Sequence, residues 1–184
     1  ITKINNNLSP DNNYQVIENF YKKMPFKLTK NQREVVNEIQ KDIHNQKTMV
    51  RMLQGDVGSG KTIVALISML HSISDGSQSV LLVPTEILAL QHYNTIKKLL
   101  APMNINVALL LGASRSNHNK NERTEVINCI ANGHVKVIVG THALISKNVT
   151  YKNLSLAVID EQHKFGVKQR YEITQKGTNV NILV

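Results

Sequence analysis

The chain has 184 residues, 41% of them hydrophobic, and its 22 basic and 13 acidic side chains give a formal net charge of +9. A hydrophobic share of this size excludes a disordered or collagen-like chain and is enough to fill the core of one domain. The sequence contains no apolar run near the roughly 18 residues that a membrane-spanning helix needs, and its first residues lack the apolar stretch of a signal peptide. We therefore expect a globular protein that has no membrane partner.

The positive charge favours a polyanionic partner such as nucleic acid, although a lysine-rich composition can also be a habit of the source organism. Aromatic residues make up 4% of the chain and tryptophan is absent, so contacts to phosphates are expected rather than base stacking. The single cysteine, Cys129, cannot form an internal disulfide, which indicates a reducing compartment such as the cytoplasm. Its apolar neighbours favour a small buried hydrophobic side chain over a reactive thiol.

The predicted elements alternate between short β-rich apolar runs and longer segments of helical period, the pattern of a parallel sheet with crossover helices. Residues 1–25 contain one helical stretch, 16–24, and are predicted to lead in from a preceding domain. Residues 26–184 are predicted to form one α/β domain. Its strands are expected at 49–53, 80–83, 107–111, 135–139, 156–159 and 181–184. Its helices are expected at 30–44, 61–74, 86–100 and 120–131, with Gly76 and Gly133 as C-caps and a surface loop at 112–121.

One motif dominates the sequence, the run Gly55-Asp56-Val57-Gly58-Ser59-Gly60-Lys61-Thr62, which matches G-x-x-x-x-G-K-[S/T] in full. It follows a predicted strand and opens a predicted helix, the context that a phosphate loop requires. The glycines let backbone N–H groups turn inward toward phosphate oxygens, and the helix adds the positive end of its dipole. We expect Lys61 to reach the β- and γ-phosphates and the Thr62 hydroxyl to bind Mg²⁺. The alternative is a glycine-rich turn without a ligand.

A pair of carboxylates follows a buried strand in the run Leu156-Ala157-Val158-Ile159-Asp160-Glu161. In a parallel sheet the carboxyl ends of the strands share one edge, and the phosphate loop leaves from that edge too. Asp160 is therefore the expected Mg²⁺ partner, and Glu161 is the candidate base that orients the attacking water. The alternative is that Asp160 caps a turn while Glu161 is only solvated. Together with the phosphate loop, the pair predicts an ATP-hydrolysing site.

The run Asp160-Glu161-Gln162-His163 is a DExH-type box, and with it the chain resembles the superfamily 2 helicases. Three more stretches resemble motifs of that superfamily and keep their order along the chain. The first runs from Phe26 to Gln32 and resembles the glutamine motif that reads adenine. The other two resemble motifs that contact the nucleic-acid backbone, and they supply the candidate DNA-binding residues Pro84, Thr85, Gly140, Thr141 and His142. By the same resemblance, Gln162 and His163 belong to the catalytic set, and His163 couples the nucleotide state to a partner domain.

Within that superfamily, residues 54–62 together with 160–167 look like the RecG-type DNA helicases, a bacterial family that remodels stalled forks and branched DNA in recombination and repair. A rival is the transcription-repair coupling factor, a duplex DNA translocase, which usually has Glu in place of Gln162 and a bulky residue in place of Ser59. The resemblance implies a RecA-like P-loop NTPase fold, a parallel β-sheet with helices on both faces. It also implies ATP and Mg²⁺ as cofactors and a monomer that contacts branched or duplex DNA mainly through its backbone.

The same resemblance implies a second RecA-like domain later in the same chain. The sequence does not begin with methionine and it ends on the apolar run 180–184, so we expect a piece of a longer protein, cut before the end of its first motor domain. Such a fragment is expected to be nearly inactive by itself, because the second domain of these motors supplies an arginine finger worth about 10³- to 10⁵-fold in turnover.

Several of these residues have simpler interpretations that stay open. Thr29 and Gln32 have the spacing of a helix capping box, which competes with adenine reading by Gln32. His142 could simply pack against the core, and His163 could be an ordinary surface histidine. The basic cluster Lys164, Lys168 and Arg170 is either a solvated face or a phosphate-binding surface. Residues 112–115 depart from the family pattern, which leaves a DNA contact in that loop open.

Overall fold

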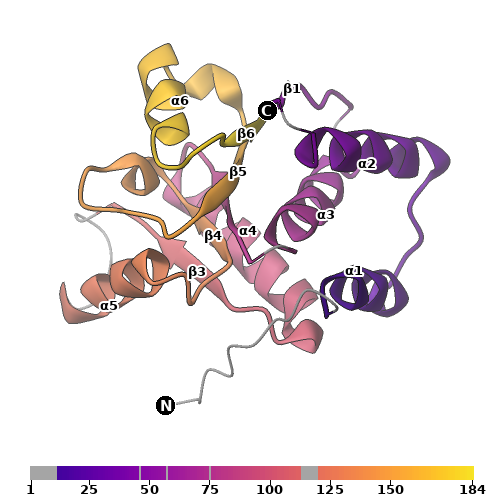
Figure 1. The fold of residues 1–184 in the computed structure, drawn as a ribbon, viewed down its shortest axis with the longest axis horizontal. Helices are drawn as coiled ribbons and strands as arrows, with labels where there is room; N and C mark the ends of the chain where they lie inside the picture. The colour runs from indigo at the N-terminus through magenta and orange to yellow at the C-terminus, as the bar shows by residue number, and fades with distance from the viewer. Residues whose placement is uncertain (1–11, 46, 57, 75, 113–119) are drawn as a thin grey trace.

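The computed structural model describes residues 12–45, 47–56, 58–74, 76–112 and 120–184, and within them the chain forms one sheet of six parallel strands (Figure 1). The strands are β1 (Val50–Arg51), β2 (Gln78–Leu82), β3 (Val107–Leu110), β4 (Val137–Gly140), β5 (Leu154–Ile159) and β6 (Asn181–Leu183). The α-helices are α1 (Asn12–Lys23), α2 (Lys30–Ile43), α3 (Lys61–Ile73), α4 (Glu86–Leu100), α5 (Lys120–Ala131) and α6 (Val167–Thr174). Short 3₁₀ helices are η1 (Ala101–Met103), η2 (His142–Ile145) and η3 (Gln162–Lys164).

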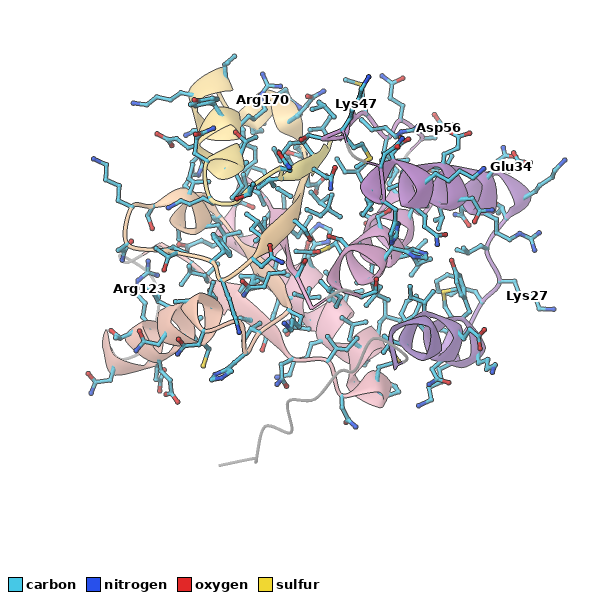
Figure 2. The ribbon with its side chains drawn as sticks, viewed as in Figure 1. Lys27, Glu34, Lys47, Asp56, Arg123 and Arg170 are labelled. Carbon is cyan, nitrogen blue, oxygen red and sulfur yellow. The ribbon has the colours of Figure 1, made fainter. Side chains whose placement is uncertain are left out.

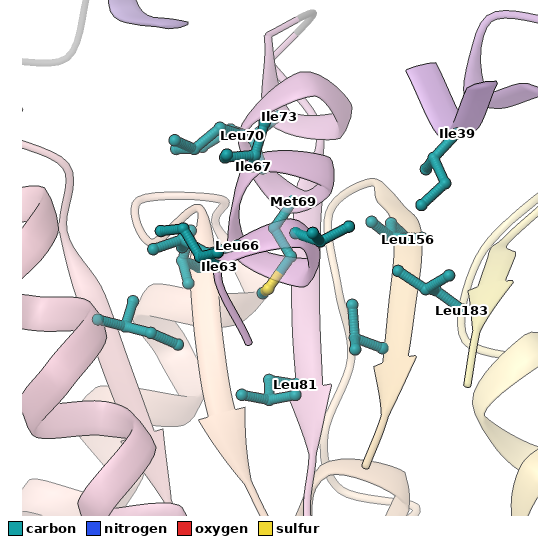
Figure 3. Packing of buried hydrophobic residues seen from close by; sticks show 14 of the residues in the cluster. Ile39, Ile63, Leu66, Ile67, Met69, Leu70, Ile73, Leu81, Leu156 and Leu183 are labelled. Carbon is teal, nitrogen blue, oxygen red and sulfur yellow. The ribbon is translucent and has the colours of Figure 1, made fainter. Parts of the chain in front are cut away.

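Helices cover both faces of the sheet, as the sequence predicts. Successive residues of a strand point to opposite faces, so Leu81 joins the core under α2, α3 and α4, whereas Leu82 joins the core under α5, η2 and α6. Figure 1 shows α5 and α6 on the opposite side of the sheet from α2 and α3. Helix α3 is buried over most of its surface, and most of its buried side chains are apolar. Figure 3 shows its Leu66 and Met69 packed near Leu81. The helix that follows the phosphate loop is thus the most firmly anchored helix of its face.

The strand order is β1-β6-β5-β2-β4-β3, and the strands end almost level at their carboxyl edge. In the register, Leu82 of β2 lies beside both Gly140 of β4 and Ile159 of β5. Two hydrogen bonds continue this alignment past the strand ends, from the Val83 N–H to the Gly140 carbonyl and from the Asp160 N–H to the Leu82 carbonyl, both at 2.9 Å. Because the strands are parallel and end level, the loops that follow them leave the sheet side by side.

Gln78 lies at the opposite, amino edge of the sheet and is completely buried. Its amide nitrogen donates to the carbonyls of Ile130 and Val135 at 2.9 and 2.8 Å. Its amide oxygen accepts from the N–H groups of Lys152 and Asn153 at 2.9 and 3.3 Å. One side chain therefore satisfies four backbone groups in the connections that lead into β4 and β5.

All predicted strands and helices are present, with ends that differ from the prediction by up to a few residues. Gly76 and Gly133 follow helices α3 and α5 with φ of 86° and 71°, which supports their assignment as C-caps. The structure adds α6, which the sequence analysis did not predict, and leaves Cys129 half-buried rather than fully buried. Residues 1–11 and most of the loop at 112–121 lie outside the described part of the chain. Within the described residues, none of the helices has the length and apolar character to cross a membrane.

The burial of His71 is expected to make the stability of the fold depend on pH. It lies in the last turn of α3, is 7% exposed, and is near His44 at the end of α2. Burial, reinforced by His44, lowers the pKa of His71 from 6.5 to about 4. The unfolded chain takes up a proton as pH falls through 6.5 and the folded chain does not until pH is near 4, so stability is lost across that window. After allowing for solvent screening, we expect a loss of about 2 kcal/mol.

Urea unfolding of the 184-residue chain at about pH 7 and about pH 4.5 measures this loss. The matched variant is His71→Leu. It places an apolar side chain in the core, and leucine cannot be protonated. Carboxylates weaken both proteins equally in acid, so the variant should lose less stability than the wild type. If both proteins lost the same free energy of unfolding, His71 would not be the source of the pH dependence.

Candidate functional site

The phosphate loop connects β1 to α3, and two of its glycines take backbone conformations that other residues rarely adopt. Gly58 and Gly60 have φ of 81° and 82°, in the left-handed region. Gly60 also lacks room for a side chain, because a Cβ there would lie 2.5 Å from the amide nitrogen of Gln32. The Gly60 carbonyl accepts the first helical bonds, from the N–H groups of Ile63 and Val64. The motif thus fits its predicted role as a turn that feeds a helix; Val57, predicted to bind nucleotide, lies outside the described residues.

Lys61, the first residue of α3, folds its ammonium back across the loop. Its Nζ donates to the carbonyls of Gly55 and Asp56 at 2.5 and 2.9 Å. A polyphosphate in the loop would offer oxygens to the same ammonium in place of these two carbonyls. The neighbouring Thr62 is exposed, so its hydroxyl is accessible to a ligand. Lys61 and Thr62 therefore lie at the start of α3, beside the phosphate loop, where the motif predicts them.

Asp160 and Glu161 follow β5 directly. The Asp160 Oδ1 accepts from the Glu161 N–H at 3.0 Å, and its Oδ2 lies 3.3 Å from Nε2 of His92 on α4. The contact with His92 is the largest cause that lowers the pKa of Asp160; burial opposes it, while the Glu161 N–H and the charge of Lys61 act in the same direction as His92. Asp160 is therefore held as a carboxylate, the form that binds a cation.

Glu161 occupies the left-handed region with φ of 49° and ψ of 56°, which is rare for a residue with a side chain. Its carbonyl accepts from the Lys164 N–H at 2.8 Å and thereby starts the short helix η3. The conformation turns the chain sharply at the end of β5 and leaves Glu161 exposed at the sheet edge. Backbone strain of this kind costs about 1–3 kcal/mol and is concentrated at functional sites.

A cavity of about 370 Å³ brings the whole predicted catalytic set together. Part of its lining is apolar and is formed by core residues that pack with α3. The predicted residues that line it are Lys61, Thr62, Asp160, Glu161, Gln162 and His163, and His92 joins them from α4. Sequence analysis missed His92, because no motif spacing marks it and its place beside Asp160 depends on the packing of α4 on the sheet.

The oxygens of Thr62 and Asp160 suit a hard cation such as Mg²⁺, which usually takes one or two protein ligands and completes its shell with phosphate oxygens and water. Among the described residues no group of three or more His, Cys, Asp or Glu side chains is placed to hold a metal. The donor set therefore fits Mg²⁺ carried by a nucleotide better than a cation held by protein side chains alone.

Gln32 forms the capping box that its spacing predicts, because it accepts from the Thr29 N–H at 2.9 Å while its own N–H donates to the Thr29 hydroxyl at 3.2 Å. Its amide nitrogen also donates to the Ser59 carbonyl of the phosphate loop at 2.7 Å. A second cavity, of about 470 Å³, is lined by Phe26, Gln32, Gly58, Gly60 and Thr62. Capping is thus shown, adenine reading by Gln32 stays a prediction, and the structure places both candidate residues beside the phosphate loop.

The five candidate DNA-binding residues lie at or just after the ends of β2 and β4, at the same edge of the sheet, but they differ in exposure. Thr85 is exposed and caps α4, accepting from the Leu88 N–H at 3.3 Å. Pro84 beside it is half-buried. Thr141 is only 7% exposed, so a hydroxyl contact from it to DNA stays a prediction that its burial does not favour. Gly140 is buried too, and a Cβ there would collide with the Leu110 carbonyl, which by itself explains the glycine.

His142 is exposed and packs against the buried ring of Phe165, with ring centroids 5.0 Å apart. Phe165 is the residue directly after η3, the short helix that contains Gln162 and His163. In the basic cluster, Lys164 and Lys168 are exposed, whereas Arg170 is half-buried and donates to the Gln162 side-chain oxygen at 3.3 Å. Figure 2 shows other basic side chains, Lys27 and Arg123, on opposite sides of the molecule, so the positive charge is not confined to this cluster.

Comparison with known proteins finds similarity to helicases. The family model of the DEAD/DEAH box helicases matches residues 29–182. The ATP-dependent DNA helicase RecG of Thermotoga maritima is 46% identical over 170 residues, which is 92% of this chain and 21% of that protein. The transcription-repair-coupling factor of Bacillus subtilis is 44% identical over 175 residues, 95% of this chain and 14% of that protein.

Two solved structures extend the comparison to the fold. The structure of RecG bound to a three-way DNA junction has a TM-score of 0.81 at 43% identity, over 93% of this chain and 22% of that one. A hypothetical ATP-dependent RNA helicase from Sulfolobus tokodaii has a TM-score of 0.65 at 21% identity, over 92% of this chain and 49% of that one, and shows the shared fold alone. The predicted RecA-like α/β fold and the resemblance to RecG-type helicases are confirmed. The chain spans about a fifth of the length of the curated helicase from Thermotoga maritima.

Proposed function

Because the chain belongs to the DEAD/DEAH box helicase family, we propose that it is the first motor domain of an ATP-dependent DNA helicase that remodels branched DNA and stalled replication forks. The observation that carries the proposal is the single cavity that gathers Lys61 and Thr62 from α3 with Asp160 and Glu161 from the end of β5. The whole protein would be a cytoplasmic monomer with a second RecA-like domain in the same chain. The names of the RecG relatives support the helicase activity, and their greater length supports a further domain in the same chain.

In the proposed reaction, Lys61 exchanges its two carbonyl acceptors for oxygens of the β- and γ-phosphates of ATP. Thr62 and Asp160 would hold Mg²⁺, which when bound neutralises charge that develops on the phosphates. Glu161 accepts a proton from the attacking water, or orients that water, from its exposed position beside Asp160. Phe26 and Gln32 would contact the adenine from the neighbouring cavity.

DNA would bind along the edge of the sheet where β2 and β4 end. The Thr85 hydroxyl is the strongest candidate donor to a backbone phosphate, because it is exposed and its oxygen, not its hydrogen, is used in capping α4. The packing of His142 on Phe165 joins the motif after β4 to the helix that carries Gln162 and His163. Through this contact, a rearrangement of η3 on hydrolysis would change how the motif after β4 binds DNA.

The test is ATP hydrolysis by the full-length protein with single-stranded, duplex and branched DNA, beside a Lys61→Ala control. We expect branched DNA to give the strongest stimulation and Lys61→Ala to abolish hydrolysis with every DNA, since the variant has no ammonium for the phosphates. Equal stimulation by plain duplex would favour a translocase like the coupling factor, a relative at 44% identity. Hydrolysis that no DNA stimulates would contradict the motor function and leave only the nucleotide site.

A further inference from the structure

His92 is an ionisable side chain that lines the nucleotide cavity, and neither the proposed reaction nor any sequence motif gives it a task. It lies in the second turn of α4, and its side chain is 18% exposed. Its Nε2 lies 3.3 Å from Oδ2 of Asp160, within hydrogen-bonding distance. A carboxylate only accepts hydrogen bonds, so a proton on Nε2 is what would let His92 donate to Oδ2.

Both oxygens of Asp160 are then engaged, each by a different element. Oδ1 accepts from the Glu161 N–H at 3.0 Å, within the turn after β5, and Oδ2 meets His92 on α4. Two contacts at the two ends of a carboxylate fix the rotation of its plane, which a single contact would leave free. Each oxygen keeps a further lone pair, so the carboxylate remains able to bind a cation.

His92 is held where it is by the packing of α4 on the sheet. The neighbouring turns of the same helix bury Ala89 and Ile96 completely, on the face that meets α3 and the strands. A surface ion pair between two mobile side chains contributes little, because ordering the side chains opposes it. Here the helix is anchored and the histidine is mostly buried, so the contact with Asp160 is already ordered before any ligand binds.

We propose that His92 is a positioning residue of the metal site, which holds the Asp160 carboxylate ready for the Mg²⁺ that accompanies a nucleotide; this rests on the proposed ATP site. Partners of this kind orient the ligands of metal ions in proteins, and their loss typically weakens metal binding by about 10- to 100-fold. His92 touches neither nucleotide nor attacking water in this assignment. It acts only through Asp160.

The experiment measures binding of a fluorescent ADP analogue to the full-length protein, first with EDTA and then at increasing Mg²⁺. For His92→Leu we expect the Mg²⁺ concentration at half-saturation to rise by about 10- to 100-fold, while affinity in EDTA stays that of the wild type. His92→Gln should restore most of the Mg²⁺ response, because the glutamine amide can donate from nearly the position of Nε2. His134→Gln, at an exposed histidine beyond α5, is the matched control and should change nothing.

An unchanged Mg²⁺ half-saturation in His92→Leu would overturn the proposal, and so would an equal loss of affinity in EDTA, which would indicate a general structural role. If His92→Leu does not fold, His92→Asn gives the same test, since its amide imitates Nδ1 rather than Nε2. A wild-type protein that binds no nucleotide in either condition would contradict the ATP site itself, and the role of His92 would fall with it. Normal wild-type binding with an unaffected variant would remove the role of His92 alone.

Discussion

Replacing Glu161 by glutamine is expected to lower ATP turnover of the full-length protein by about 10²- to 10⁴-fold while leaving nucleotide binding intact. Glutamine has the same size and can still hydrogen-bond, but it cannot accept a proton from water at neutral pH. It also meets the same backbone strain at φ of 49°, so the turn after β5 should not change. Lys61, Thr62 and Asp160 remain to bind the nucleotide. Single-turnover hydrolysis and equilibrium binding of ATP separate the two effects.

The matched control is Glu125→Gln, which makes the same chemical change at an exposed position of α5, away from the nucleotide cavity. It should hydrolyse ATP like the wild type. If Glu161→Gln kept turnover within a few-fold of the wild type, Glu161 would not be the base, and another group at the cavity would have to orient the water. If it lost nucleotide binding as well, its main role would be structural.

Replacing Gln78 by leucine is expected to destabilise the chain by about 3–5 kcal/mol, the largest loss that we expect from one polar side chain in this fold. Leucine is similar in volume but leaves three backbone groups without the partner that Gln78 provides, the Val135 carbonyl and the N–H groups of Lys152 and Asn153. The Ile130 carbonyl would keep its bond from the Gly133 N–H. Each such group costs about 1–3 kcal/mol when it stays dry, and water can relieve part of the cost at the edge of the sheet. Urea unfolding of the 184-residue chain measures the difference.

Gln175→Leu is the control for this experiment, because Gln175 is an exposed residue at the end of α6. It should change the free energy of unfolding by no more than about 0.5 kcal/mol. A Gln78→Leu variant as stable as the wild type would mean that the connections into β4 and β5 find other partners. The nucleotide cavity lies at the far edge of the sheet, so any variant molecules that remain folded should still bind nucleotide normally.

The parts of the fold and site that sequence predicts well are those that depend on local patterns. The phosphate loop and the carboxylates after β5 are consecutive residues whose chemistry requires a fixed spacing, so a motif identifies them without knowledge of the fold. The strands and longer helices have apolar residues at regular intervals. Helix α6 escaped prediction because it is short and two of its apolar residues, Val167 and Tyr171, face solvent, leaving only Ile173 buried.

The parts that sequence does not predict depend on which elements become neighbours. His92 lies far from Asp160 in the sequence, and only the packing of α4 on the sheet brings the two together. The burial of Thr141 likewise follows from the sheet, because its N–H bonds to the Leu110 carbonyl of β3 at 3.3 Å, next to Gly140. Strand order is a tertiary property, since pairing between distant segments leaves no periodic pattern in the chain.

At Glu161, selection for a stable backbone and selection for ATP hydrolysis would favour different residues. Glycine or asparagine would adopt the left-handed turn at lower cost, so either residue would make the domain more stable. Neither could serve as the base that we propose for ATP hydrolysis. A lineage that no longer needed ATP hydrolysis would therefore gain stability by losing the carboxylate, and position 161 should be among the first at the site to drift. By the same reasoning, we expect an acid at this position in homologues that remain ATP-driven motors.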